Sequence, residues 1–307
     1  MSTIIIGVDA SERSEDAIAF GRRLAAVTTA DVVVANAYPY SNTPSRASNA
    51  GYRNALREDA LITVRNMRSK LEGLPEERSQ IKIIADLSSA KALHDLAHAE
   101  QAALLIVGST HTGHAGRVLP GSTGERLTHG APCSVAVVPK DYRDRPDSPV
   151  RRIGVAYNDT EEAKAATAAA AALARAFDAE LELIGVVSTE YFTTPALMTA
   201  EGVEAMRREV EEHVQESLDA ALAALPEGVT AHARRVTGEP VELLTTASAN
   251  LDLLVTGSRG YGPLHSVLVG GVSGRLLRTA QCPVIVVPRG IEAPLETLFG
   301  GSAATVA

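Results

Sequence analysis

The clearest chemical pattern in the sequence is a run of glycines between Thr256 and Gly274, in the stretch TGSRGYGPLHSVLVGGVSG. Two residues separate Gly257 from Gly260, and nine more then lead to Gly270. Glycine has no Cβ and reaches positive φ at little cost, so a loop with this spacing can bring backbone amides against an anion. A helix that begins near Gly270 would add free N–H groups and a partial positive charge. The pattern predicts a phosphate site, with tight turns alone as the simpler alternative.

The elements around this loop occur twice, because the chain contains an internal repeat. When the sequence is shifted by 149 residues, LLIVGS aligns with LLVTGS and VAVVP aligns with VIVVP, without a gap. A repeat of this length indicates the tandem duplication of a whole domain. We expect domains at residues 1–140 and 151–289, an exposed linker at 141–150 whose charges and prolines lack periodicity, and a disordered tail at 290–307.

Within each half, short apolar runs rich in β-branched residues alternate with longer segments of helical periodicity. Strands that are apolar on both faces and alternate with helices are typical of a parallel sheet covered on both sides. Each half is therefore predicted to be a doubly wound α/β domain of about five strands, with the glycine loop at the carboxyl ends of the strands. Long polar loops at 38–50 and 188–200 are placed where a lid could close. The first half is expected to have strands at 4–9, 32–38, 81–86, 104–108 and 135–138, and helices at 12–27, 52–71, 90–100 and 122–128.

The glycine loop resembles a known nucleotide-binding signature. GxxG, nine residues and a further glycine, with GVD near the start of the chain and CPVIVVP near the end, is similar to the pattern of the universal stress protein family, and the resemblance covers both halves. It implies two five-stranded sheets in the strand order 3-2-1-4-5, of a Rossmann-like type that binds adenine nucleotides. It also implies ATP at the carboxyl edge, with or without Mg²⁺, and a role in the stress response without catalysis.

The same resemblance implies dimerisation through the last strand of each domain. In a tandem chain the segments SVAVVP and PVIVVP could pair within one polypeptide. The two domains would then form an intramolecular pseudo-dimer, and a homodimer of whole chains is an alternative.

The resemblance assigns binding roles to the second half residue by residue. The phosphate-binding glycines match in full, but a glycine follows the third of them where serine or threonine is usual, and a nearby serine is the candidate hydroxyl. The family's acidic residue at the end of the first strand is an asparagine here, whose amide can still hydrogen-bond a ribose hydroxyl or an adenine edge. The loop arginine could balance phosphate charge or be simply exposed. The second-half set is Asn158, Val186 as the apolar contact to adenine, Gly257, Arg259, Gly260, Gly270, Gly271 and Ser273.

The first half departs from the pattern at a different place. It keeps the acid as Asp9, which also precedes a helix and could serve as a cap. It keeps Gly108, but His111 stands where the second glycine belongs, and its side chain could block close approach of a ligand to the backbone. Nucleotide binding is therefore expected more in the second domain than in the first. The first-half set is Asp9, Ala37 as the adenine contact, Gly108, Gly121 and Ser122.

Composition argues against several classes of partner. The net charge of −8 disfavours nucleic acid, whose binding depends on a basic surface. No apolar run approaches the ~20 residues that span a bilayer, and the start MSTIIIGVDASE lacks a basic region. We expect a cytoplasmic protein that binds neither nucleic acid nor membrane. Cys133 and Cys282 lie in no CxxC pair and are expected to be buried, inert thiols.

The other candidate residues favour neither a metal site nor catalysis. His94 and His98 are four residues apart on one expected helix face, but the Glu of an HExxH motif is absent. His111 and His114 flank the first-half loop without paired carboxylates or cysteines at ligand spacing. No GxSxG elbow with a following acid and histidine is present, so no hydrolase triad is predicted.

The sequence thus predicts a non-catalytic ATP-binding protein of the universal stress type. Bound nucleotide would order the glycine loop and change assembly or partner binding through its higher affinity for one state. Two alternatives stay open. One is a nucleotide-free dimerisation scaffold, which the replaced site residues would favour, and the other is a slow ATPase with Asp9 or Asp159 as the candidate base.

Overall fold

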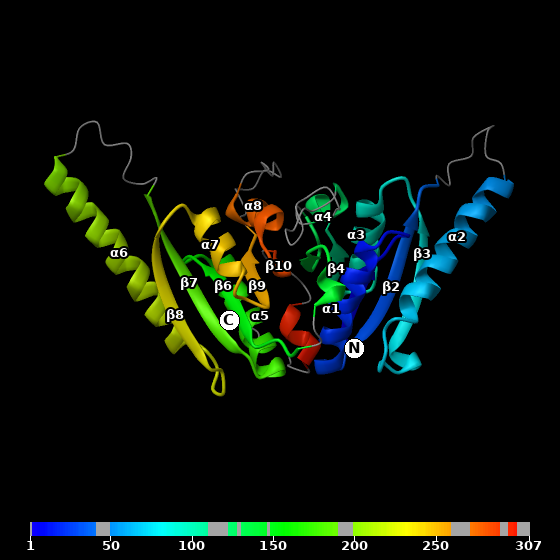
Figure 1. Ribbon diagram of the computed structural model, residues 1–307, viewed down its shortest axis with the longest axis horizontal. Helices are drawn as coiled ribbons and strands as arrows, with labels where there is room; N and C mark the ends of the chain where they lie inside the picture. The colour runs from blue at the N-terminus through cyan, green and yellow to red at the C-terminus, as the bar shows by residue number, and fades with distance from the viewer. Residues whose placement is uncertain are drawn as a thin grey trace. The chain divides into compact units, whose positions relative to one another are not determined.

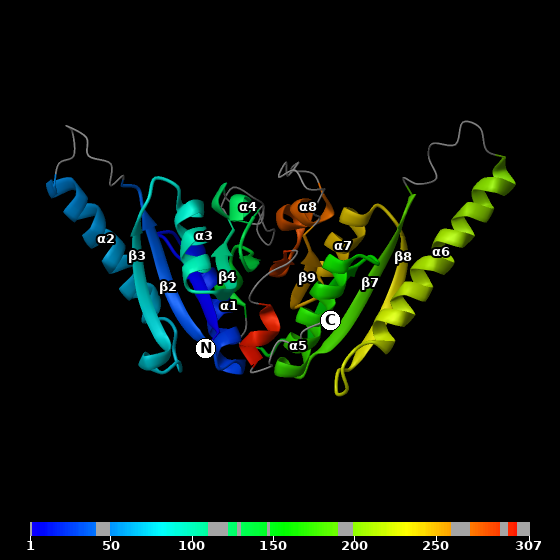
Figure 2. The ribbon, with the colours of Figure 1, turned by 180° about the vertical axis from the view of Figure 1, so that it is seen from behind.

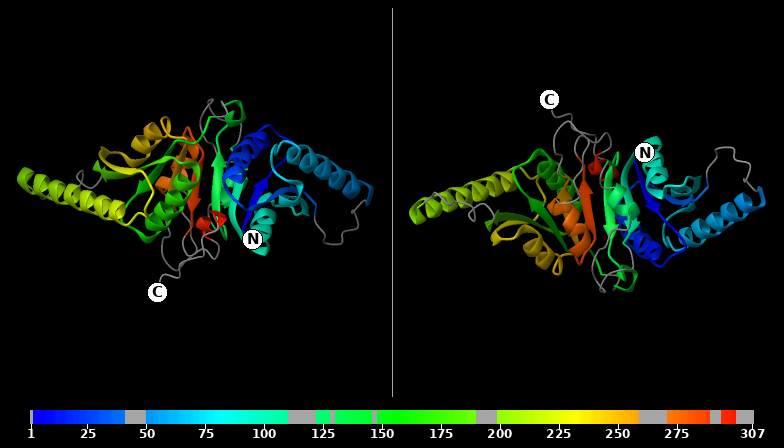
Figure 3. Two further views of the ribbon diagram at one scale, coloured as in Figure 1. Left: turned by 90° about the horizontal axis from the view of Figure 1, so that it is seen from below. Right: turned by 90° about the horizontal axis from the view of Figure 1, so that it is seen from above.

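The computed structural model of the chain contains two compact α/β units (Figure 1). Unit 1 comprises Met1–Ser148 together with Gly290–Ala307, and unit 2 comprises Pro149–Arg289. In each unit, helices cover both faces of a parallel sheet (Figures 2 and 3). The boundary between the units falls within the expected linker. The structure describes residues 2–40, 50–109, 122–127, 130–145, 148–189, 199–258, 271–288 and 294–299.

Strands and helices alternate along unit 1. They are β1 (Thr3–Gly7), α1 (Arg13–Val27), β2 (Asp31–Tyr38), α2 (Ala50–Arg68), β3 (Ser79–Ala85), α3 (Ser89–Ala99), β4 (Ala102–Gly108), α4 (Ser122–Leu127) and β5 (Ser134–Val138). The strands are parallel in the predicted order β3-β2-β1-β4-β5, and each predicted element overlaps an observed one. All side chains at 4–6 and 104–106 are fully buried. Coverage on both faces explains why these runs are apolar without alternation.

Unit 2 repeats this architecture. Its elements are β6 (Arg152–Tyr157), α5 (Glu161–Phe177), β7 (Glu180–Ser188), α6 (Ala200–Ala223), β8 (Ala231–Gly238), α7 (Pro240–Ser248), β9 (Leu253–Gly257), α8 (Val272–Thr279) and β10 (Val284–Val287). The strand order β8-β7-β6-β9-β10 is again 3-2-1-4-5 within the unit. The hydroxyl of Thr160 caps α5 by accepting the N–H of Ala163 at 3.3 Å. This cap fixes the start of a helix whose first turn reaches the carboxyl edge of the sheet.

The start of the expected linker packs against unit 1. Residues Tyr142–Asp144 form a 3₁₀ helix beside α1, and Tyr142 is only 2% exposed. Its ring meets Phe20 edge to face with 5.8 Å between centroids, and the guanidinium carbons of Arg23 and Arg145 lie 5.1 and 5.3 Å from its centroid. Such ring contacts contribute about 0.5–1.5 kcal/mol each. One aromatic side chain therefore anchors a segment whose charges and prolines predict exposure.

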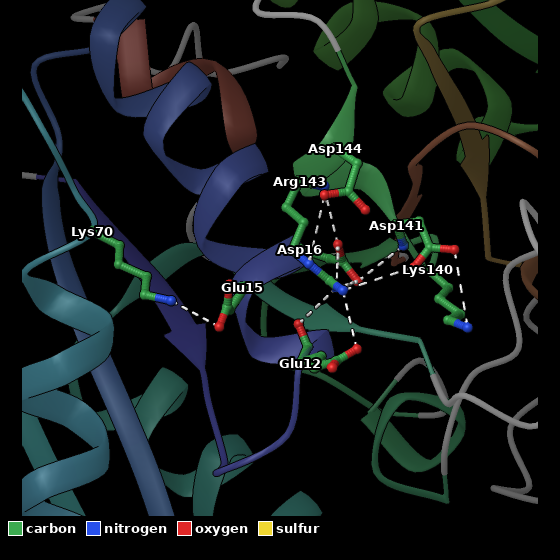
Figure 4. Close-up of polar contacts among 8 residues, drawn as sticks. All are labelled: Glu12, Glu15, Asp16, Lys70, Lys140, Asp141, Arg143 and Asp144. Atoms are coloured by element: carbon green, nitrogen blue, oxygen red, sulfur yellow. Dashed lines mark hydrogen bonds and ion pairs between the residues drawn. The ribbon is translucent and has the colours of Figure 1, made fainter.

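A buried carboxylate holds the same segment in place. Asp16 of α1 is fully buried and accepts the backbone N–H groups of Asp141 at 3.2 Å and Arg143 at 3.0 Å (Figure 4). The Arg143 guanidinium lies 3.3 Å from Asp16 and 3.0 Å from the carboxylate of Glu12. Burial raises the pKa of Asp16, while these hydrogen bonds and the guanidinium oppose the rise. A buried carboxylate needs such partners, so this contact fixes the geometry of the linker start.

The expected disordered tail also contains packed structure. Residues Leu295–Phe299 form a 3₁₀ helix of unit 1 against β4, in which Leu295 and Leu298 are fully buried. The hydroxyl of Ser2 donates to the carbonyl oxygen of Thr297 at 2.8 Å. Leu295 and Leu298 are three residues apart, so both lie on the same side of this single helical turn. The polar and small residues around them make this short apolar pattern hard to recognise in the sequence.

Both cysteines are fully buried. Burial raises the pKa of the Cys133 thiol to about 12, so this side chain stays protonated at neutral pH. Among the helices of the described residues, none combines the length and apolarity that crossing a membrane requires.

Candidate functional site

A cavity of about 420 Å³ lies at the carboxyl edge of the sheet in unit 2. It is bounded by the ends of β6, β7 and β9 and by the starts of α5, α7 and α8. Doubly wound sheets bind ligands at this edge, and the volume falls in the range of small-molecule sites, roughly 300–1,000 Å³. Four residues predicted from the sequence line it together: Asn158, Val186, Gly257 and Ser273.

The lining of this cavity combines apolar and hydrogen-bonding groups. Ile184, Val186 and Leu244 supply aliphatic surface, while Asn158 and Thr160 supply an amide and a hydroxyl. The Thr160 hydroxyl donates to the amide oxygen of Asn158 at 3.1 Å, which orients that side chain. A lining of this kind suits a flat, weakly polar ring that carries a hydroxylated group.

The first glycine of the loop has a packing role in addition to any contact with a ligand. A Cβ at Gly257 would lie 2.7 Å from both the carbonyl carbon and the carbonyl oxygen of Glu162, at the start of α5. In unit 1, a Cβ at Gly108 would overlap the carbonyl oxygen of Arg13 and lie 2.7 Å from its carbonyl carbon. Each glycine therefore lets the helix after the first strand approach the fourth strand closely.

The corresponding cavity of unit 1 is much smaller, at about 80 Å³. The predicted residues Asp9, Ala37 and Gly108 line it together, and Arg13 of α1 joins them. A space of this size is well below the range of ligand sites. The two units therefore present their matching residues around cavities of very different volume.

The carboxylate of Asp9 is occupied by its own neighbours. It accepts the N–H of Ser11 at 3.0 Å and the hydroxyl of Ser14 at 2.9 Å, and it forms an ion pair with Arg13, whose Nε lies at 2.9 Å. Burial opposes ionisation of Asp9, but the hydrogen bonds from Arg13 and Ser11 outweigh burial and lower its pKa from 3.8 to about 2. Asp9 thus stabilises the turn before α1. It is not the N-cap residue of this helix, because that position belongs to Glu12.

The Asp9 contacts predict a pH dependence of stability. Because the folded pKa of Asp9 lies below its unfolded value, its contribution is complete above about pH 4 and disappears as the pH falls towards 2. The side chain is 40% exposed, so solvent screening limits the expected gain to about 1 kcal/mol. Urea denaturation between pH 3 and pH 6 should show Asp9→Asn approaching wild-type stability as the pH falls. Arg13→Gln should show the same convergence, and a constant difference across this range would contradict the interpretation.

The remaining predicted residues are only partly described. Gly271 is the N-cap residue of α8, at φ −68° and ψ 163°, and Ser122 is the first residue of α4. The lid segments lie largely outside the described residues, at 41–49 and 190–198. Six further residues that the sequence singles out also lie outside the described ranges: Gly121, Arg259, Gly260, Gly270, His111 and His114.

Sequence reasoning did not identify several residues of the two cavities. Arg13 of unit 1 and Glu162 of unit 2 occupy matching places, and the shift of 149 residues would have aligned them. Ser188 and Thr256 carry no comparable signal, because a hydroxyl at the end of a buried strand is common. Within the described parts of the chain, no group of three or more His, Cys, Asp or Glu side chains is placed to hold a metal, and the ring of His94 instead contacts Asp95 at 3.1 Å.

These features define a class of protein: tandem doubly wound α/β domains, one with a ligand-sized cavity at the carboxyl edge of its sheet. A model of the universal stress protein family matches residues 1–139 and 149–288. The chain belongs to the universal stress protein family and carries two copies of its domain.

Individual relatives share this length and architecture. A universal stress protein of Mycolicibacterium smegmatis is 28% identical over 299 residues, which cover 92% of this chain and 96% of the relative. Universal stress protein Rv2005c of Mycobacterium tuberculosis is 27% identical over 297 residues, with the same coverage. The crystal structure of a universal stress protein from Archaeoglobus fulgidus matches with a TM-score of 0.64 and 18% identity, over 94% of this chain and 96% of that one. This structural match confirms the predicted fold class.

Proposed function

We propose that this chain is a non-catalytic stress-response protein that binds an adenine nucleotide in the cavity of unit 2. The observation that carries the proposal is that Asn158, Val186, Gly257 and Ser273 line one cavity of about 420 Å³. They come from four separate parts of the unit, and the family resemblance gives or suggests a nucleotide contact for each. ATP is the ligand that the resemblance implies.

The lining suggests how the nucleotide would lie. Val186 and Ile184 would pack against adenine, and Asn158 would hydrogen-bond the ribose or the adenine edge. The N-terminus of α8, with Ser273 in its first turn, would direct N–H groups towards phosphate. Mg²⁺ would enter as a counterion of the nucleotide phosphates rather than through a preformed protein site.

Bound nucleotide would act on assembly. A ligand that prefers one conformational state stabilises that state by its difference in affinity. We propose the last strands, β5 and β10, as the pairing elements, either within one chain as a pseudo-dimer or between chains in a homodimer. The family resemblance supports this assignment. We also propose a cytoplasmic location without nucleic-acid or membrane partners, on the grounds of the acidic net charge and the lack of a long apolar run in the sequence.

Unit 1 would serve as the structural half of the pair. Its cavity of about 80 Å³ and the engagement of Asp9 by Arg13 favour a scaffold role over nucleotide binding. The alternative of a nucleotide-free scaffold, which the sequence left open for the whole chain, therefore applies to unit 1 alone in this proposal.

A matched pair of variants tests the assignment. Val186 and Ala37 occupy equivalent places in the two units, so Val186→Gln should weaken nucleotide binding at least about tenfold by placing an amide against the ring, whereas Ala37→Gln should leave it unchanged. Equilibrium dialysis of nucleotide-stripped protein against labelled ATP and Mg²⁺ should give one nucleotide per chain for the wild type.

Circular dichroism melting of both variants provides the folding control. Absence of binding to the wild type at millimolar ATP would remove the proposal, since such a Kd corresponds to only about 4 kcal/mol. Equal weakening by both substitutions would show that the site is not confined to unit 2.

A further inference from the structure

Two neighbouring helices form part of the wall of the unit 2 cavity. They are α7, which contributes Pro240 and Leu244, and α8, which contributes Val272 and Ser273. The two helices are in contact, and both begin at the carboxyl edge of the sheet (Figure 1). The position of the α8 start relative to α7 therefore determines where the first N–H groups of α8 lie in the cavity.

The side chain of Glu239 connects the starts of these two helices. Its Oε2 atom caps α7 by accepting the N–H of Glu242 at 2.7 Å. Its Oε1 atom is shielded from water and lies 3.3 Å from a guanidinium nitrogen of Arg275 in α8. A carboxylate oxygen that is removed from water needs a cation or a donor close by, and the guanidinium supplies the cation. One carboxylate thus caps α7 and forms an ion pair with α8, an arrangement that we call the Glu239–Arg275 bridge.

The bridge acts on the end of α8 that has no side-chain cap. The N-cap residue of α8 is Gly271, which has no side chain to accept a hydrogen bond from the first turn. The backbone N–H of Arg275 closes this turn by donating to the carbonyl oxygen of Gly271 at 3.2 Å. Further from the cavity, the hydroxyls of Thr245 and Thr279 join the two helices at 2.5 Å. The bridge therefore holds the first turn of α8 against α7 at the cavity end.

The corresponding place in unit 1 has no carboxylate. The N-cap residue of α3 is Ser88, whose uncharged hydroxyl accepts the N–H of Lys91 at 3.3 Å. The shift of 149 residues aligns Arg275 with Arg126 of α4, so the arginine is present in both units. The glutamate occurs only in the unit whose cavity has the size of a ligand site, so the fold does not require it.

We propose that the Glu239–Arg275 bridge is a positioning pair, which holds the first turn of α8 where its N–H groups and Ser273 meet the phosphate of a bound adenine nucleotide. The proposal rests on the function proposed above and names two further residues on which that site depends. Donors that are held in place before binding need no ordering when the phosphate arrives, so a fixed helix start binds phosphate more tightly than a loose one. The proposed adenine and ribose contacts come from β7 and from Asn158, so the bridge should affect the affinity for AMP and leave the affinity for adenosine unchanged.

Calorimetric titration of the nucleotide-stripped protein with adenosine and with AMP, in about 0.15 M salt, tests this proposal. Glu239→Gln keeps an oxygen that can cap α7 and removes the negative charge, while Arg275→Gln removes the positive charge. Each should weaken AMP binding about fivefold, the double variant should bind AMP no more weakly than the single variants, and adenosine affinity should change by less than about twofold. An effect of charge alone would differ in sign, because Glu239→Gln would then strengthen the binding of anionic AMP.

Two further variants serve as controls. Arg275→Lys retains a cation that can pair with Glu239, so it should recover most of the AMP affinity that Arg275→Gln loses. Lys164→Gln also removes a positive charge near this edge, but Lys164 is 51% exposed, pairs with Glu161 and is not part of the cavity lining. It should change AMP affinity by less than about twofold.

The outcomes separate this inference from the function on which it rests. If neither adenosine nor AMP binds the wild type, the proposed nucleotide function itself fails. If both ligands bind, three results would each show that the positioning role is wrong while nucleotide binding stands. These are unchanged AMP affinity in the two glutamine variants, shifts of AMP affinity in opposite directions, and an equal loss of adenosine and AMP affinity.

Discussion

Replacing Gly108 with alanine is expected to lower the free energy of unfolding by about 3 kcal/mol. A Cβ there would overlap the carbonyl oxygen of Arg13 and lie 2.7 Å from its carbonyl carbon. Both atoms are backbone atoms at the start of α1, so no change of side-chain rotamer can relieve the overlap. Either β4 and α1 must separate or the first turn of α1 must unwind. Urea denaturation of the nucleotide-free protein, followed by circular dichroism, measures the loss.

Gly130→Ala is the control in the same unit. A Cβ at Gly130 would meet nothing within 4 Å, so this change should alter the free energy of unfolding by less than about 0.5 kcal/mol. Gly257→Ala should resemble Gly108→Ala, because its Cβ would lie 2.7 Å from the backbone of Glu162. Equal stability of the Gly108 and Gly130 variants would contradict the packing role. If Gly108→Ala weakened nucleotide binding and left the free energy of unfolding unchanged, Gly108 would have only the phosphate-binding role that the sequence predicts.

The fold could be predicted almost completely because its signal is local and repeated. Apolar runs such as III at 4–6 are buried on both faces, which removes the alternation seen in half-exposed strands. The repeat then gives two independent readings of each element, so an ambiguous strand in one half is settled by its counterpart. The strand order came from the family resemblance, since local periodicity carries no information about which strands are neighbours.

Some of the residues that line the two cavities could be predicted from the sequence, whereas the electrostatics of these cavities could not. Asn158, Val186 and Gly257 lie at strand ends, and strand ends of a parallel sheet meet at one edge whatever the side chains are. The ion pair between Asp9 and Arg13 depends on the side-chain rotamers of both residues. A spacing of four residues allows such a pair but does not require it, so the sequence could not predict it.

The segments outside the two predicted domains were the least predictable. A single buried ring at Tyr142 packs the start of a segment that consists largely of charged residues and prolines, and composition averages such a residue away. Likewise, Leu295 and Leu298 form too short a pattern for a helical period to be recognised in the sequence. In both segments long-range packing overrides the local signal.

The double substitution of Leu295 and Leu298 by alanine should therefore destabilise the protein by about 4–6 kcal/mol, at the usual cost of about 2–3 kcal/mol for each buried leucine. Both side chains are fully buried in the 3₁₀ helix that lies against β4, and the Ser2–Thr297 hydrogen bond ties this helix to the start of the chain. Removing them would leave a cavity beside a central strand of unit 1. The free energy of unfolding from urea denaturation is the measurement.

Leu87 offers the matched control for this last prediction. It is a leucine of the same unit that is 73% exposed, so Leu87→Ala should change the free energy of unfolding by less than about 0.5 kcal/mol. If the tail were disordered, as the sequence alone predicts, the double variant would behave like Leu87→Ala. A large loss for the double variant alone would instead show that the chain, after completing unit 2, returns to complete the core of unit 1.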